Sequence, residues 1–472
     1  MKLTYNVNDR PKFGQLLLFG LQQLLAILAA TIAVPSIIGN GMSQSAALFG
    51  AGVGTVVYLL FTKFRSPVFL GSSFAFIGSM FAAFAGAASA QAGHAGLILG
   101  ALFAGLVYVI IAIVIKLAGV RWINKLMPAV VIGPTVAIIG LSLAGNAVGD
   151  LTKGKVMKDV VTQVVKDGAI VDDVSQVSVA SPYVALVCGL VTLFVVILCS
   201  VYGKKMAKLI PFIIGICAGY AAAAIFTVIG IASGNDALKI IDFSVFRNMD
   251  WFAIPDFTFF EAAKGLKAID GHYIATVAVA YVPVAFVVFA EHIADHKNLS
   301  TIIDKDLLED PGLHRTLLGD GVGSIAGSIF GGCPNTTYGE SVGCVAITGN
   351  ASVVTILTTA AMAMIISFFG PFVTFLASIP NCVMGGVCIT LYGFIAVSGL
   401  KMIKEVDLGD NRNLFVVAVI LICGIGGLTV SFGKVTLTSI ACALILGILT
   451  NVMVSAGKNR EASDSSAPSD KE

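Results

Sequence analysis

The sequence predicts an all-α polytopic membrane protein, and three observations lead to that prediction. First, 57% of the 472 residues are hydrophobic and the mean hydropathy is +0.94. Second, only 12% are charged, about half of the roughly 25% usual in a soluble domain. Third, apolar stretches reach the roughly 20 residues that a helix needs to cross a bilayer. The 29 basic and 27 acidic residues nearly balance, which argues against a nucleic-acid partner.

Fourteen apolar stretches separated by polar residues are the predicted membrane spans. Spans 3, 9 and 10 (66–85, 318–333 and 334–348) are weaker than the others because they are rich in Gly, Ser, Thr, Asn and Pro. The clearer spans are 13–39, 44–62, 93–118, 126–148, 183–202, 209–232, 273–294, 351–370, 380–399, 412–431 and 436–456.

The Lys and Arg residues predict that both termini are cytoplasmic. With fourteen spans and an inner N-terminus, 20 of the 29 basic residues fall on the inner side, as the positive-inside rule requires. Eight of the other nine lie in two long outer loops, 149–182 and 233–271, which we expect to be ordinary solvated surface. Only Lys434 violates the rule in a short loop. We therefore expect a multi-pass protein of the cytoplasmic (inner) membrane with a disordered tail at 457–472.

Paired sequence features indicate an internal repeat. Residues 127–133 of span 5 match residues 379–385 of span 12, and polar clusters interrupt span 3 at 71–76 and span 10 at 333–340. Each pair is seven spans apart, and because seven is odd the two halves must have opposite orientations. Matched interrupted spans are the best sequence indication of a transporter's binding site, since non-helical backbone at membrane depth must face protein or water. Glycines that serve helix packing are the alternative, and they explain the matched polar clusters poorly.

The nine cysteines lie in or beside apolar runs without CxxC or Cys/His ligand spacing, so we expect buried thiols rather than metal ligands or disulfides. No nucleophile and base stand in a recognisable spacing. The sequence therefore predicts neither an enzyme nor a bound metal or organic cofactor.

Ionisable residues within the spans are concentrated at Glu291, His292, Asp295 and His296 in span 8 and at Glu340 in span 10. A charge at the bilayer centre costs about 3 kcal/mol or more, so such groups usually face a cavity. Two carboxylates at one cavity can exchange a proton with solvent, which is the minimal machinery of a proton-coupled carrier. Hydropathy alone leaves a second reading open, in which residues 291–296 are the cytoplasmic end of a helix and the histidines are packed or solvated.

At these positions the sequence resembles the nucleobase–cation symporter family, the nucleobase–ascorbate transporter group that contains the bacterial uracil permeases. The resemblance runs from about Arg10 to Ala456. The family signature appears as Glu340-Ser341-Val342-Gly343 followed by Thr348. The stretches that carry the resemblance are 71–76, 290–292, 310–315 and 334–340.

The resemblance implies a fold of fourteen spans in two inverted repeats of seven, with a short extended strand interrupting each of spans 3 and 10. A core domain would move against a gate domain, and a homodimer is expected. The implied division is a cytoplasmic N-terminus at 1–12, core segments at 13–118 and 273–370, gate segments at 121–232 and 372–456, and the tail at 457–472.

The resemblance also implies roles for individual residues. Glu291 and Glu340 would accept hydrogen bonds from a nucleobase, and the backbone N–H groups of Phe74 and Gly339 would donate to it. Ala30, Tyr338 and Tyr392 would line the pocket, with Ser73, Ser341 and Gln23 supporting it. Proton coupling would use Glu291, Asp295 and Glu340.

The implied function is proton-coupled import of uracil by alternating access, with the proton as coupling ion. Glu340 favours uracil because purine carriers of the family commonly have Gln there, so a xanthine or urate carrier is the alternative. An anion exchanger or channel of similar architecture is a further alternative that would need a basic residue at the site. Three departures from the family pattern affect this prediction: Ser341 replaces an Asn, Gln23 replaces a His, and Asp295 stands where some uracil carriers have His.

Overall fold

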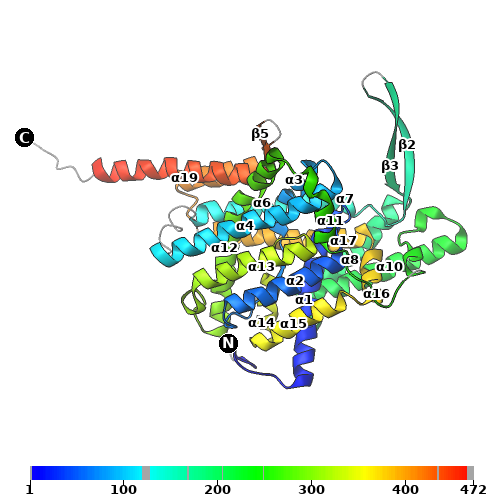
Figure 1. The fold of residues 1–472 in the computed structure, drawn as a ribbon, viewed down its shortest axis with the longest axis horizontal. Coiled ribbons are helices and arrows are strands. Elements are labelled where there is room, and N and C mark those ends of the chain that lie inside the picture. The colour runs from blue at the N-terminus through cyan, green and yellow to red at the C-terminus, as the bar shows by residue number, and fades with distance from the viewer. Residues whose placement is uncertain are drawn as a thin grey trace, which may run out of the picture.

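The computed structural model describes residues 3–119, 128–166, 169–204, 206–247, 249–404, 406–432 and 435–464. Within these ranges the chain is mainly helical (Figure 1). Met127 of the repeated motif, the start of the expected gate segment at 121 and Lys434 lie outside the described residues.

The first half of the chain contains α1 (Phe13–Ile38), α2 (Gln44–Phe61), β1 (Leu70–Ser72), η1 (Phe74–Phe76), α3 (Ile77–Ala85), α4 (Ala90–Ala118), α6 (Ala129–Ser142), α7 (Ala144–Asp150), β2 (Met157–Lys166), β3 (Ala169–Ser178), α8 (Pro182–Tyr202), α9 (Met206–Leu209) and α10 (Pro211–Ser233). The second half contains η2 (Asp236–Leu238), η3 (Phe243–Phe246), α11 (Thr258–Gly265), η4 (Leu266–Ala268), α12 (Gly271–Ile303), η5 (Leu308–Gly312), α13 (Leu313–Gly331), β4 (Asn335–Thr337), α14 (Gly339–Thr348), α15 (Val353–Ile366), α16 (Gly370–Ser378), α17 (Asn381–Ile403), α18 (Asn411–Ile425), β5 (Val430–Phe432), β6 (Val435–Leu437) and α19 (Ser439–Asp464).

Local chemistry explains where several of the long helices begin. The Ser43 and Ser89 hydroxyls accept the N–H groups of Ala46 and Ala92 at the starts of α2 and α4, and Asp270 accepts the Tyr273 N–H at 2.7 Å before α12. Such side chains satisfy N–H groups that have no partner inside the helix. Pro182 and Pro211 occupy the first turns of α8 and α10, where a missing N–H costs nothing.

The prediction of a helical membrane protein is confirmed. Within the described residues, eight helical segments are long and apolar enough to cross a membrane: α1, α2, α4, α6 with α7, α8, α10, α12 and α17. Four shorter apolar segments accompany them, at residues 74–85, 353–366, 411–425 and 439–455. In the described residues, each predicted span coincides with a helix, with a strand and the helix that follows it, or, for span 5, with the two helices α6 and α7. The number of fourteen crossings stays a prediction.

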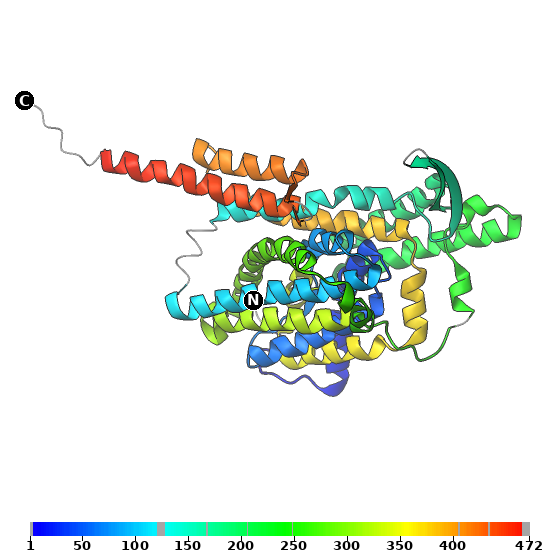
Figure 2. The same cartoon turned by 45° about the horizontal axis from the view of Figure 1, so that its top comes forward.

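The helices form two groups that lie against each other. In one group α2 and α4 pack on α13, α1 packs on α15, and α12 packs on α4. In the other group α17 packs on α6 and α8, α8 on α10, and α18 on α6 and α19. Figure 2 shows the second group as a layer that covers one side of the first.

Two short strands meet inside the first group, which confirms the extended interruptions implied for spans 3 and 10. β1 and β4 pair antiparallel, with Gly71 opposite Thr336. A Cβ added to Gly71 would lie 2.2 Å from the Tyr338 ring, so only glycine admits that ring here. The Tyr338 hydroxyl donates to the Ser72 carbonyl at 2.8 Å, which fixes the start of α14 against β1.

Two regions differ from the sequence prediction. The outer loop at 149–182, expected to be ordinary solvated surface, contains a long hairpin of β2 and β3 that projects from the helices (Figure 1). The signal for it was present, because runs rich in valine flank Asp167-Gly168, a dipeptide typical of hairpins. The expected disordered tail begins as helix, since α19 continues to Asp464 through Lys, Arg, Glu and Ala residues that favour helix.

Candidate functional site

A cavity of about 370 Å³ lies between the two groups of helices. Residues of η1, α12, β4 and α14 line it from the first group, and residues of α6, α10 and α17 line it from the second. Both strand interruptions therefore border the same cavity, as matched interruptions of a transporter are expected to do.

Three carboxyl groups line the cavity: Glu291 and Asp295 from α12, and Glu340 from the first turn of α14. Glu291 and Asp295 are four residues apart and share one helix face. The Thr337 hydroxyl donates to the Asp295 carboxylate at 3.1 Å, so Asp295 is bonded to the strand opposite its own helix. The cavity thus presents several acceptors that can reach one small ligand.

Two chain segments that begin helices border the same space. Phe74 begins η1 after β1, and Gly339 begins α14 after β4; both line the cavity. The first N–H groups of a helix have no partner within it, and they carry partial positive charge. A neutral ligand with alternating N–H and C=O groups could therefore bond to carboxylates and backbone amides together.

The opposite wall is mainly apolar. It is formed by Val136 and Ile139 of α6, Phe212 of α10, and Leu391 and Phe394 of α17. An apolar wall facing a polar one suits a flat ligand that carries polar groups around its edge.

Most of the residues predicted for the site come together around the cavity. Those that line it are Glu291, Asp295, Glu340, Ser73, Phe74, Tyr338 and Gly339. Tyr392 is 2% exposed and packs edge-on against Phe74, with ring centroids 5.9 Å apart, so it stands behind the cavity wall. Ala30 is 1% exposed and is not among the lining residues.

Two of the departures from the family pattern contact each other. The Gln23 side chain of α1 donates to the Ser341 hydroxyl of α14 at 2.6 Å, and the Phe69 N–H donates to the same oxygen at 3.0 Å. Ser341 thereby joins α1, α14 and the segment before β1. This contact supports the predicted supporting role of both side chains, which lie outside the cavity lining.

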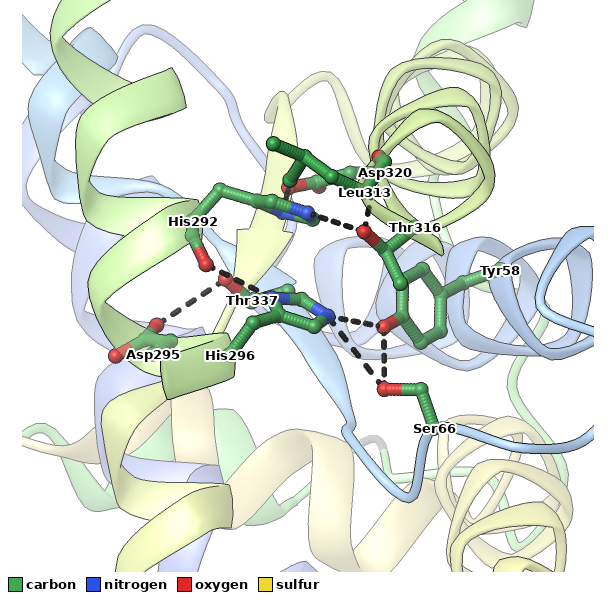
Figure 3. Close-up of polar contacts among 9 residues, drawn as sticks. All are labelled: Tyr58, Ser66, His292, Asp295, His296, Leu313, Thr316, Asp320 and Thr337. Carbon is green, nitrogen blue, oxygen red and sulfur yellow. Dashed lines mark hydrogen bonds and ion pairs between the residues drawn. The ribbon is translucent and has the colours of Figure 1, made fainter. Parts of the chain in front are cut away.

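Asp320 was not among the residues predicted from the sequence, and the role of the two histidines was left open. His292, His296 and Asp320 are each 0% exposed. His292 lies 2.6 Å from Asp320 and 3.0 Å from Thr316, both on α13 (Figure 3). Asp320 belongs to predicted span 9, and an acid at membrane depth is itself a functional signal that could have identified it.

A family profile described as a permease family matches residues 14–432. The chain belongs to this permease family. Relatives named uracil permease include one from Bacillus caldolyticus, 38% identical over 96% of this chain and 95% of that protein. Another from Bacillus subtilis is 36% identical over 98% of both chains, and one from Escherichia coli is 32% identical over 94% of this chain and 92% of that protein.

Solved structures share the fold of the permease at low sequence identity. The transmembrane domain of a cyanobacterial bicarbonate transporter matches with a TM-score of 0.60 and 16% identity, over 95% of this chain and all of that one. A murine anion transporter of the Solute Carrier 26 family matches with a TM-score of 0.62 and 14% identity, over 96% and 69%. The permease is therefore a multi-pass membrane transporter rather than an enzyme, as the sequence predicted.

Proposed function

We propose that the permease imports uracil together with protons across the cytoplasmic membrane by alternating access. The observation that carries the proposal is the cavity lined by Glu291, by Glu340, and by the residues that begin η1 and α14. Full-length relatives named uracil permease support uracil as the substrate.

The chemistry of the cavity suits uracil. Uracil is flat and neutral, and its edge alternates N–H and C=O groups. Glu291 and Glu340 would accept the ring N–H groups, while the backbone amides of Phe74 and Gly339 would donate to the carbonyls. A hydrogen bond to a carboxylate is about twice as strong as one between neutral groups. A site built this way rejects analogues that leave a buried partner unpaired.

The charges of the cavity argue against an anion as substrate. Among its described lining residues there are three carboxyl groups and neither Lys nor Arg. An anion would meet like charge without a compensating cation. The permease thus differs in substrate class from the transporters of bicarbonate and other anions whose fold it shares.

The packing pattern supports alternating access. Equivalent segments of the two predicted repeats contact each other in three places: α2 with α13, β1 with β4, and α6 with α17. Other contacts occur in equivalent pairs: α1 packs on α15 as α12 packs on α4, and α8 packs on α10 as α18 packs on α19. This is the pattern expected of two inverted repeats. We propose that the first group (13–118 and 273–370) is the core domain, and the second (121–232 and 372–456) the gate.

The cavity extends toward the predicted cytoplasmic side. Its lining includes Phe212 in the first turn of α10 and Ser398 and Met402 near the end of α17, and both helix ends adjoin predicted inner loops. We infer an inward-facing conformation. Glu291, Asp295 and Glu340 would then meet cytoplasmic water and release coupled protons there.

Uptake of radiolabelled uracil into proteoliposomes, with and without an inward proton gradient, tests this function. We expect gradient-stimulated uptake that excess xanthine leaves unchanged. Glu291→Gln should abolish it, whereas Glu309→Gln, an exposed acid outside the cavity, should transport like the wild type. Uptake of xanthine in place of uracil would contradict the substrate, and uptake indifferent to the gradient would contradict proton coupling.

A further inference from the structure

Beside the cavity, α12 carries a second set of titratable side chains on a neighbouring face. Glu291 and Asp295 line the cavity, whereas His292 and His296 are fully buried. His292 Nδ1 lies 2.6 Å from Asp320 Oδ2, and Asp320 is also fully buried. Figure 3 shows the two imidazoles between α12 and the side chains of Thr316, Asp320 and Tyr58.

The contacts of Thr316 favour one arrangement of protons on His292. Its hydroxyl donates to the Leu313 carbonyl at 3.1 Å and lies 3.0 Å from His292 Nε2. A hydroxyl has a single proton, and here that proton is directed to the carbonyl. With that proton on the carbonyl, Thr316 accepts from His292, and Nε2 bears hydrogen. The 2.6 Å contact between Nδ1 and Asp320 then requires one further proton between them.

The surroundings of Asp320 favour that proton on the carboxyl group. Asp320 Oδ1 has no hydrogen-bond partner among the described residues, although the Thr337 backbone approaches the carboxyl group. An ionised carboxylate with an unpaired oxygen is costly in an apolar interior, and a neutral acid is much less so. The result is a chain of donors from Asp320 to His292, from His292 to Thr316, and from Thr316 to the Leu313 carbonyl.

We propose that Asp320 is a protonated acid, held by His292, and that its proton is exchanged during the transport cycle. The pair would be a proton site additional to the cavity carboxylates. This proposal rests on the proposed function, because it assigns the pair to proton coupling of the same transporter.

A second set of contacts connects this pair toward the predicted cytoplasmic side. The His292 and His296 rings are 4.0 Å apart between centroids. His296 Nε2 lies 2.7 Å from the Tyr58 hydroxyl, which lies 2.7 Å from the Ser66 hydroxyl. Ser66 directly follows Arg65, whose side chain is 51% exposed. His296 Nδ1 donates to the His292 carbonyl at 2.8 Å, so the two rings contact by packing. Within the hydrogen-bonded series of His296, Tyr58 and Ser66 a proton can pass by small rotations.

Other titratable groups around the pair would couple it to the cavity. They are Glu291 and Asp295 on α12, Glu340 on α14, Tyr58 on α2 and Tyr108 on α4. A negative charge on a cavity carboxylate favours the proton on Asp320, and neutralising that carboxylate weakens the preference. Occupancy of the cavity and protonation of the pair are thereby linked.

Two variants and a control test the proposal. Asp320→Asn keeps a donor toward His292 Nδ1 but holds no exchangeable acid proton, and Thr316→Val removes the acceptor of the His292 Nε2–H while preserving shape. Asp304→Asn is the control, because residue 304 is exposed and left-handed, a conformation Asn tolerates. Each protein is reconstituted, and uracil counterflow at equal pH is compared with accumulation under an inward gradient of one pH unit. Infrared spectra of the purified proteins report the carbonyl stretch of protonated carboxylic acids.

For Asp320→Asn we expect counterflow close to wild type, loss of one acid carbonyl band, and accumulation lower by about tenfold, since one coupled proton is equivalent to a factor of about ten per pH unit. Accumulation equal to wild type, or an unchanged acid band, would overturn the proposal. Should this variant fail to fold, Thr316→Val provides the test. In Thr316→Val we expect His292 to carry its proton on Nδ1 and Asp320 to be an ionised acceptor, so one acid band should be lost. An acid band that persists in this variant would refute the assignment. A wild-type protein that does not transport uracil would refute the proposed function, while the infrared band still tests the proton on Asp320.

Discussion

Gly71→Ala tests whether the close contact between β1 and the start of α14 positions the site. An added Cβ would lie 2.2 and 2.3 Å from two atoms of the Tyr338 ring, so the ring must move. The move would break the 2.8 Å bond from the Tyr338 hydroxyl to Ser72. We expect a loss of about 1 kcal/mol for the hydrogen bond and about 1–3 kcal/mol for overpacking, together about 2–4 kcal/mol of stability.

The displacement would also reach the substrate, because Tyr338 precedes Gly339, whose N–H we propose as a donor. A misplacement of about 1 Å can cost about a hundredfold in rate, so uracil transport should fall more than the stability loss alone explains. Thermal unfolding in detergent and uracil binding by calorimetry measure the two effects on the same preparation.

Gly78→Ala is the matched control. Gly78 lies in α3, and a Cβ there would meet nothing within 4 Å. Alanine should therefore stabilise the helix by about 0.5–1 kcal/mol. Equal stability and equal binding in the two variants would refute the role of Gly71. Tyr338→Leu introduced into Gly71→Ala should recover stability if the ring is the obstacle, and failure to recover would also contradict the reasoning.

Three further predictions concern hydrogen bonds at or near the cavity. Glu340→Gln should weaken uracil binding by about 1.5–3 kcal/mol, the usual contribution of a hydrogen bond to a charged group, and wild-type uptake in that variant would remove Glu340 from the site. Asp295→Asn should leave binding intact and reduce pH-driven accumulation, whereas equal loss of both would place Asp295 in the substrate site. Gln23→Ala and Ser341→Ala should each cost about 1 kcal/mol of stability, and a double-mutant cycle on unfolding should show a coupling energy if their 2.6 Å bond stabilises the protein.

The architecture could be predicted from the sequence to a large extent. Membrane spans can be predicted from local hydropathy, because the bilayer stabilises each apolar stretch independently of its neighbours. The interrupted segments at 71–76 and 333–340 became β1 with η1 and β4 with α14, since their Gly, Pro and Thr residues disfavour continuous helix. Glu291, Asp295 and Glu340 were identified for the same local reason, as acids within otherwise apolar stretches, and the structure places all three at one cavity.

Other features depended on contacts between residues far apart in the chain. Gln23 donates a hydrogen bond to Ser341, which is 318 residues away in the chain. The family pattern identified both residues as departures but did not show that they contact each other. Gly71 and Tyr338 share one space only because β1 and β4 pair in a single register. Tyr392 and Ala30 were expected at the pocket, but the packing of Phe74 against Tyr392 and the burial of Ala30 keep both behind its wall.

The sequence by itself determined the membrane environment, the interrupted spans and the acidic character of the site. Each of these is visible in a short segment, because the free energy of transferring a segment into lipid depends on its own apolar and polar residues. The tertiary structure decided which buried polar groups share a proton. The face of α12 that holds His292 meets Asp320 and Thr316 of α13, while a neighbouring face holds Glu291 and Asp295 at the cavity. Whether two side chains share a proton depends on the distance and direction between donor and acceptor. For side chains on different helices, both are fixed only when the helices pack.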